Sequence, residues 1–198
     1  MDADTYPRED VKKFLGSMIL MKINPEAGKE QRKVADQFDV NSYPRLIVLT
    51  PKGEILEEIK GRPEPDAFER SYTTDRWNEF VGAQDAKPRD HVKMAKNLFT
   101  IATWYPQTEH GKKAAESAKT NMSSPEFKAA WDELQTTHDR ESTSLKADAQ
   151  LKLGKKKEAI ETYKDVATRF PGTKEGDAAA AALKKLGVKL APPGEAGK

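Results

Sequence analysis

The sequence predicts a chain of two fold classes: an α/β domain at residues 1–84, an all-α domain of helical hairpins at residues 85–190, and a disordered tail at residues 191–198. Three observations support this division. Strand-like apolar runs occur only in the first part. From about Pro88 onward alanine becomes abundant and helical stripes follow one another with short breaks. A block of sequence in the second part also occurs twice, which is typical of repeated helical hairpins. The boundary is expected within residues 82–89.

The first part begins with helices and strands in alternation. Apolar side chains recur at helical spacing in residues 8–15, which predicts a helix that ends at Gly16. Met18–Ile23 is an apolar run interrupted by one lysine, and we expect it to form a buried strand. An Asn-Pro pair then breaks the chain, and residues 29–38 again show helical spacing.

A β-hairpin and a helix complete the first part. The apolar segments at residues 45–50 and 54–60 flank a Pro-Lys-Gly turn, and this pattern predicts two paired strands. A helix is expected at residues 65–72, or as far as Val81 in a longer version.

The repeated block is Ala102–Thr108, which recurs as Ala167–Thr173. Each copy contains an aromatic residue, a proline, a variable residue and a threonine, and each is followed by a glycine, Gly111 or Gly176. Small, aromatic, apolar and proline positions also follow one another in the clearest unit, at Ala147, Gly154, Ala159, Tyr163, Val166 and Pro171. These intervals resemble those of a tetratricopeptide repeat. The second part is therefore expected to be a tetratricopeptide-like solenoid of about three hairpins, with an ordinary helical bundle as the alternative.

The spacing has a physical basis. Small residues let two helices approach closely, and proline ends the second helix of a hairpin. We expect a final helix at residues 176–186 and a more divergent pair at residues 112–120 and 126–137. The duplicated aromatic-Pro-x-Thr block resembles a variety of repeat found in bacterial envelope proteins.

The first part resembles the thioredoxin family over about residues 1–82. The resemblance depends on the segment Val34–Leu49, the hairpin turn after it and the order of helices and strands, from which the family's first strand is missing. In that family Pro44 would be the cis-proline, and the backbone at Tyr43 would pair with an extended peptide. Arg45 departs from the family, where threonine is more usual. The other interpretation is that Tyr43 and Pro44 only shape a loop.

The family's Cys-x-x-Cys motif would lie immediately before Met1, and this chain contains no cysteine. Two explanations remain open: a piece of a longer thioredoxin-like protein, or a shortened and redox-inactive relative. The central strand that precedes the motif would also be missing. Backbone groups at residues 18–23 or 45–50 would then lack a partner strand, which predicts self-association through an open sheet edge.

Composition argues against several other classes. A chain without cysteine forms no disulfide and no thiolate metal site. The net charge of +2 lacks the imbalance typical of nucleic-acid binding, and no apolar run approaches the ~20 residues needed to span a bilayer. His91, His110 and His138 are isolated from one another in the sequence, so we predict no metal, no cofactor and no catalytic residue.

These observations favour a non-catalytic, protein-binding or scaffolding module whose predicted peptide-binding residues are Tyr43 and Pro44. The concave face of the solenoid would offer a second binding surface. One alternative is the portion of a thiol-disulfide oxidoreductase that follows its Cys-x-x-Cys motif, and another is a structural envelope component. The acidic N-terminus shows no signal-peptide pattern. The resemblance implies a bacterial periplasm or envelope location.

Overall fold

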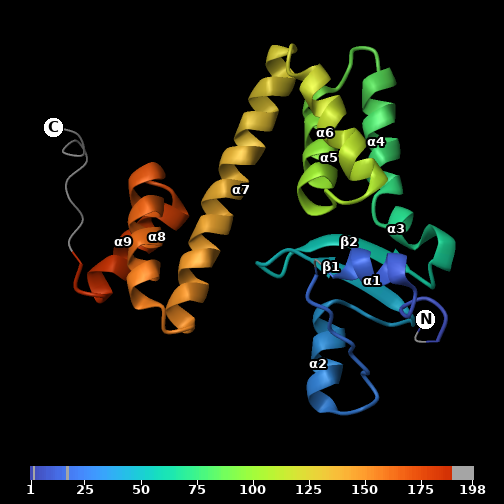
Figure 1. Cartoon of the computed structure of the whole chain (residues 1–198), viewed down its shortest axis with the longest axis horizontal. Coiled ribbons are helices and arrows are strands. Elements are labelled where there is room, and N and C mark those ends of the chain that lie inside the picture. Colours follow the sequence, from blue (N-terminus) through green and yellow to red (C-terminus); the bar gives the residue numbers. More distant parts are fainter. Residues whose placement is uncertain (2, 17, 189–198) are drawn as a thin grey trace. The chain divides into compact units, whose positions relative to one another are not determined.

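The computed structural model describes residues 1, 3–16 and 18–188, and over these residues the chain is mostly helical with one small antiparallel sheet (Figure 1). This agrees with a mixed α/β and helical chain. The predicted tail at residues 191–198 lies outside the described residues. The chain divides into two compact units, Met1–Trp131 and Asp132–Lys198.

The first unit holds the sheet and most of the helices: α1 (Glu9–Leu15), α2 (Lys29–Gln37), β1 (Arg45–Leu49), β2 (Ile55–Lys60), the 3₁₀ turn η1 (Pro65–Ala67), α3 (Phe68–Ser71), α4 (Thr74–Asp85), α5 (His91–Trp104) and α6 (Glu109–Asn121). The division falls inside the long helix α7 (Pro125–Lys152). The second unit continues with α8 (Lys156–Arg169) and α9 (Lys174–Lys185).

The two early helices and the β-hairpin form where they were predicted. The helix expected at residues 65–72 forms as η1 followed by α3, and the longer version as far as Val81 is interrupted before α4. The break lies at Tyr72 and Thr73, whose side chains turn into the core and are almost fully buried. Thr73 has a non-helical φ of −127°, so the chain changes direction there before α4 begins.

The predicted buried strand at Met18–Ile23 is wrong. In the structure this segment belongs to no strand, and Ile19, Leu20 and Met21 are 97%, 65% and 76% exposed. A strand is stable only when a neighbouring strand satisfies its backbone groups. No described strand lies beside this segment, because the sheet contains β1 and β2 alone.

An aromatic core holds the first unit together. Helix α1 lies beside the hairpin (Figure 1). Val11 and Phe14 of this helix are buried in a cluster on which Leu46 and Val48 of β1 also pack. Tyr105, which follows α5, is also fully buried in this cluster, and its ring lies 6.3 Å from that of Phe14. Tyr105 therefore joins α5 to the α/β part.

The observed division thus differs from the predicted limit between residues 84 and 85. Helices α4 and α5 lie on opposite sides of that limit, yet they pack against each other. The backbone N–H of Asp90 donates to the carbonyl oxygen of Ala83 at 3.1 Å, and Asn97 donates to Glu79 at 3.4 Å. Helix α5, the first helix of the predicted helical domain, therefore packs on α4, and Tyr105 at its end lies in the core that contains the hairpin.

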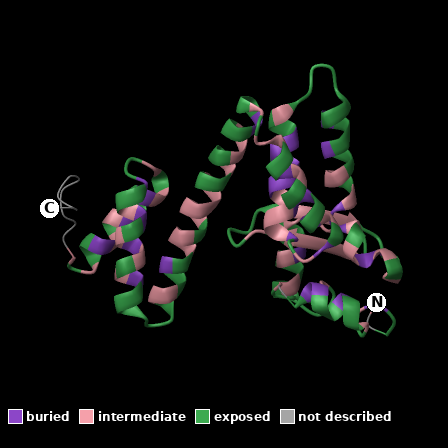
Figure 2. Cartoon of the chain, turned by 45° about the horizontal axis from the view of Figure 1, so that its top comes forward, coloured by how far each residue is buried: buried purple, intermediate pink, exposed green. Residues whose placement is uncertain are grey.

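The second unit has its own small core, which appears in purple in Figure 2. Four of the predicted small, aromatic and apolar positions, Ala147, Ala159, Tyr163 and Val166, are buried there together. Phe170, Ala179 and Leu183 complete the cluster. The hydroxyl of Tyr163 donates a 2.6 Å hydrogen bond to Asp148. Gly154 is exposed and has a φ of +75°, so it makes the turn between α7 and α8 rather than a helix contact.

The duplicated block forms the same turn twice, between α5 and α6 and between α8 and α9. The Thr108 hydroxyl donates to the Tyr105 carbonyl at 2.8 Å and accepts from the Gly111 N–H at 2.8 Å. The Thr173 hydroxyl makes the equivalent bonds, to the Phe170 carbonyl at 2.7 Å and from the Gly176 N–H at 3.1 Å. Each threonine caps the helix that follows it, and this explains why the threonine and glycine recur together.

Candidate functional site

The hairpin presents one strand edge that no described strand covers. The Gly61 N–H donates to the Pro44 carbonyl at 3.0 Å, which makes residues 44 and 61 a hydrogen-bonded pair. Hydrogen-bonded and non-hydrogen-bonded pairs alternate along an antiparallel ladder. Given the register Arg45↔Lys60 and Ile47↔Glu58, the backbone groups of Arg45 and Ile47 point away from β2. This side of β1 is the open edge.

The predicted peptide-binding residues lie at the start of the open edge. Tyr43 and Pro44 directly precede β1, and both are exposed, with 54% of Tyr43 accessible. The Tyr43–Pro44 peptide bond is cis, as the family resemblance implied. The Pro44 carbonyl is used by Gly61, so an incoming segment would have to bind at Tyr43 and at the outward-facing groups of Arg45 and Ile47.

The outer side of β2 is occupied, in contrast to the open edge. Arg76 of α4 donates to the carbonyl oxygen of Leu56, and its Nε lies 3.0 Å from a carboxylate oxygen of Glu57. Both charged side chains of this ion pair are largely shielded from solvent. The two edges of the sheet are therefore not equivalent, and β1 offers the freer one.

Exposed apolar side chains lie in the same unit as the open edge. Ile19, Leu20 and Met21 are followed by Asn24 and Pro25, while the start of the segment is anchored by Met18, which packs on the aromatic core. The sequence pattern singled out these residues as core, so their role as a surface was missed. The signal that could have revealed it was the expected lack of a partner strand at residues 18–23 or 45–50, which the prediction of a buried strand at Met18–Ile23 left out of account.

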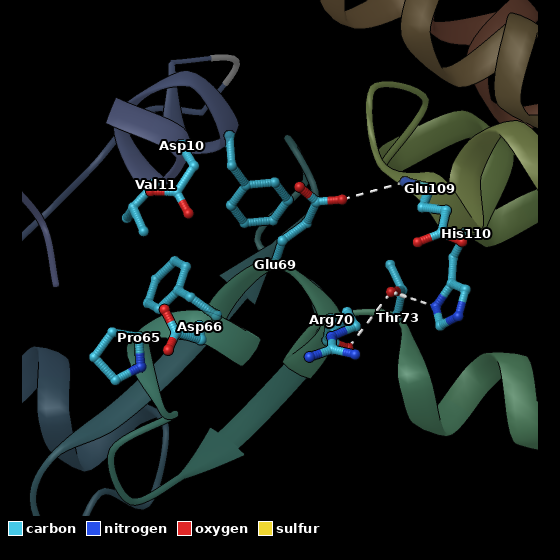
Figure 3. A pocket seen from close by; sticks show the side chains of 11 residues that line it. Asp10, Val11, Pro65, Asp66, Glu69, Arg70, Thr73, Glu109 and His110 are labelled. Atoms are coloured by element: carbon cyan, nitrogen blue, oxygen red, sulfur yellow. Dashed lines mark hydrogen bonds between the residues drawn. The ribbon is translucent and has the colours of Figure 1, made fainter. Parts of the chain in front are cut away.

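A polar pocket of about 220 Å³ lies between α1, the η1–α3 segment and the start of α6 (Figure 3). Its rim is charged and includes Asp10, Asp66, Glu69, Arg70 and Glu109. Glu69 accepts a 3.2 Å hydrogen bond from the backbone N–H of Glu109. This contact links the hairpin side of the unit to α6.

The acidic groups of this pocket are committed to nearby cations. Arg8 lies 3.0 Å from Asp10 and 2.5 Å from Asp66, and its hydrogen bond lowers the pKa of the Asp10 carboxyl. A hydrogen bond from Lys113 likewise lowers the pKa of Glu109. Both carboxyl groups stay ionised at neutral pH, which does not suit a general acid.

His110 holds a fixed position in the wall of the pocket. Its Nδ1 is hydrogen-bonded at 2.8 Å to the hydroxyl of Thr73, a buried residue that the sequence did not single out. Its ring is parallel to that of Trp77, with 5.0 Å between ring centres. Burial lowers the pKa of the imidazole, which favours the neutral ring. These contacts give the histidine a packing role between α4 and α6, and they make the pocket a junction between helices rather than a reaction site.

Metal ligands and membrane spans were also searched for. In the described part of the chain, no three His, Asp or Glu side chains come together as a metal site would require. None of the described helices is both long enough and apolar enough to cross a bilayer.

Comparison of the chain with family models, with curated proteins and with solved structures found no match. Function is therefore inferred from the geometry of the open edge and of the residues around it.

Proposed function

We propose that the chain is a non-catalytic protein-binding module that holds an extended segment of a partner along the open edge of β1. The observation that carries this proposal is the outward direction of the backbone groups of Arg45 and Ile47, beside the exposed Tyr43. Addition of a strand to a free sheet edge is a common mode of peptide recognition, in which backbone hydrogen bonds supply much of the affinity.

The proposal extends to the family assignment. The thioredoxin-like character of the first part is supported by the order helix, helix, hairpin, helix and by the cis bond before β1. The tetratricopeptide-like character of the second part is supported by the two capped turns and by the buried small residues Ala147 and Ala159. From the resemblance we also propose a location in a bacterial envelope.

Binding of extended peptides to the full chain tests the proposal. Peptides would be selected from a displayed library, and their affinity measured by fluorescence anisotropy. Ile47→Pro removes one outward-facing N–H donor, and the loss of one hydrogen bond of about 1 kcal/mol should weaken binding roughly fivefold. Tyr43→Ala should also weaken binding, since it removes an exposed aromatic contact at the start of the edge.

Lys60→Pro is the matched control for Ile47→Pro. Lys60 opposes Arg45 in a non-hydrogen-bonded pair, so its N–H also points outward, but from the β2 side. This variant should leave peptide affinity unchanged. Circular dichroism of each variant shows that the hairpin is intact. Failure to select any peptide, or equal loss of binding in both proline variants, would contradict the proposal.

A further inference from the structure

Two segments of the first unit lack a partner strand in the described structure. One is the open edge of β1, with the outward backbone groups of Arg45 and Ile47. The other is Met18–Ile23, which is non-helical and belongs to no strand. The Met18 N–H already donates to the carbonyl oxygen of Leu15, so a strand pairing with β1 would be formed by the part of the segment that follows it.

The two segments also match in length and chemistry. Strand β1 has five residues and Met18–Ile23 has six, bounded by Gly16 on one side and Asn24 on the other. The three exposed residues of the segment, Ile19, Leu20 and Met21, are all apolar, and isoleucine is among the residues enriched in strands. A run of contiguous exposed apolar side chains on a soluble unit commonly marks an interaction surface.

We infer that the partner of the open edge is a second copy of this chain, which supplies its own Met18–Ile23 segment as the added strand. The exchange is reciprocal: each copy gives one segment and receives one on β1. Every contact then occurs twice about a two-fold axis, and the assembly closes as a dimer. This inference deepens the proposed function and rests on it, because it names the partner of the same edge.

A second copy fits this edge because one chain carries both complementary parts. The segment does not pair with β1 of its own chain. Two short strand contacts belong to the size class of weak assemblies. We therefore expect a dissociation constant on the order of micromolar.

Sedimentation equilibrium of the full chain, over micromolar to millimolar concentrations, is the first test. The wild type should dimerise, and the double variant Ile19→Lys/Met21→Lys should weaken the dimer at least tenfold. Residues 19 and 21 share one face of an extended segment, and both are exposed in the single chain, so the variant should fold normally. Val92→Lys is the matched control, because Val92 is 62% exposed on α5, away from both segments in sequence.

Cross-linking tests which segments meet. The chain has no cysteine, so a Leu20→Cys chain mixed with an Ile47→Cys chain can be joined by a short bismaleimide only at those positions. The mixture should yield far more cross-linked dimer than either variant alone. An entirely monomeric wild type, or a dimer unaffected by Ile19→Lys/Met21→Lys, would overturn the inference.

The two proposals fail in different ways. A monomeric chain that still binds library peptides, and loses them on Ile47→Pro, would refute the second-copy partner and leave the proposed function standing. A dimer whose contacts do not involve β1, together with a chain that binds no library peptide, would refute both proposals.

Discussion

Two glycines of the repeated turns allow a close approach that no other residue could make. A Cβ added at Gly111 would lie 1.9 Å from the carbonyl oxygen of Tyr105, and one at Gly176 would lie 1.9 Å from that of Phe170. Ordinary contact begins at 3.4 Å, so the turn and the helix would have to separate by about 1.5 Å. Because the opposing atoms are backbone, no side-chain rotation can relieve the overlap.

The expected loss of stability follows from what this movement disrupts. In Gly111→Ala it would break the cap from Thr108, which contributes about 1 kcal/mol. It would also displace Tyr105 from the aromatic core, and such strain typically costs about 1–3 kcal/mol. The helix gains at most about 1 kcal/mol from alanine. We therefore expect Gly111→Ala to lower the free energy of unfolding by about 1–3 kcal/mol, and Gly176→Ala to act similarly.

Urea unfolding measures both effects. Trp77, Trp104 and Trp131 all lie in the first unit, so tryptophan fluorescence follows Gly111→Ala and far-ultraviolet circular dichroism is needed for Gly176→Ala. Gly82→Ala is the control: Gly82 lies within α4, and nothing comes within 4 Å of the added Cβ. It should stabilise the unit by about 0.4–1 kcal/mol. A Gly111→Ala chain as stable as the wild type would refute the reasoning.

Three further predictions concern the sheet, the pocket and the two buried tyrosines. Val48→Pro should lower the free energy of unfolding by about 1 kcal/mol or more, because it removes a bond to β2, whereas Ile47→Pro should change urea stability much less. Burial lowers the pKa of His110, so the unfolded chain binds a proton at this imidazole more readily than the folded chain does. The contribution of His110 to the free energy of unfolding should therefore be full above pH ~6.5 and fall as the pH drops through the lowered pKa. Urea unfolding measured at a series of pH values should show this loss in the wild type and not in His110→Gln. The Tyr105 hydroxyl is buried with no hydrogen-bond partner among the described residues, so Tyr105→Phe should be neutral or stabilising in thermal unfolding. Tyr163→Phe removes the bond to Asp148 and should destabilise by about 1 kcal/mol.

The sequence predicted local structure well where the chemistry is local. The Tyr/Phe-Pro-x-Thr block with its glycine forms a capped turn in both copies, because a threonine, its capped N–H and the glycine all lie within a few residues. The hairpin was equally predictable from its turn and apolar strands. The pairing of Thr73 with His110 was not, since 37 residues separate them and neither belongs to a recognisable motif.

The domain limit could not be read from composition, because packing between residues far apart in the sequence decides it. The change in composition near residue 85 is real, yet Tyr105 lies beyond it and is fully buried against Phe14 and Tyr72. Helix α5 is thereby held to the hairpin's core. Periodicity along α5 shows which of its faces is apolar, but not which partner covers that face.

The Met18–Ile23 segment shows most clearly the difference between what a local sequence pattern predicts and what the rest of the fold provides. Its apolar residues are typical of a strand, but a strand forms only beside a neighbouring strand. Whether such a neighbour exists depends on the whole fold and cannot be read from the segment itself. Without one, three apolar side chains stand in solvent and the backbone of β1 has a free edge. Both features expose groups that proteins normally cover. A partner strand would satisfy them together, which is why the failed strand prediction and the proposed binding edge have one physical cause.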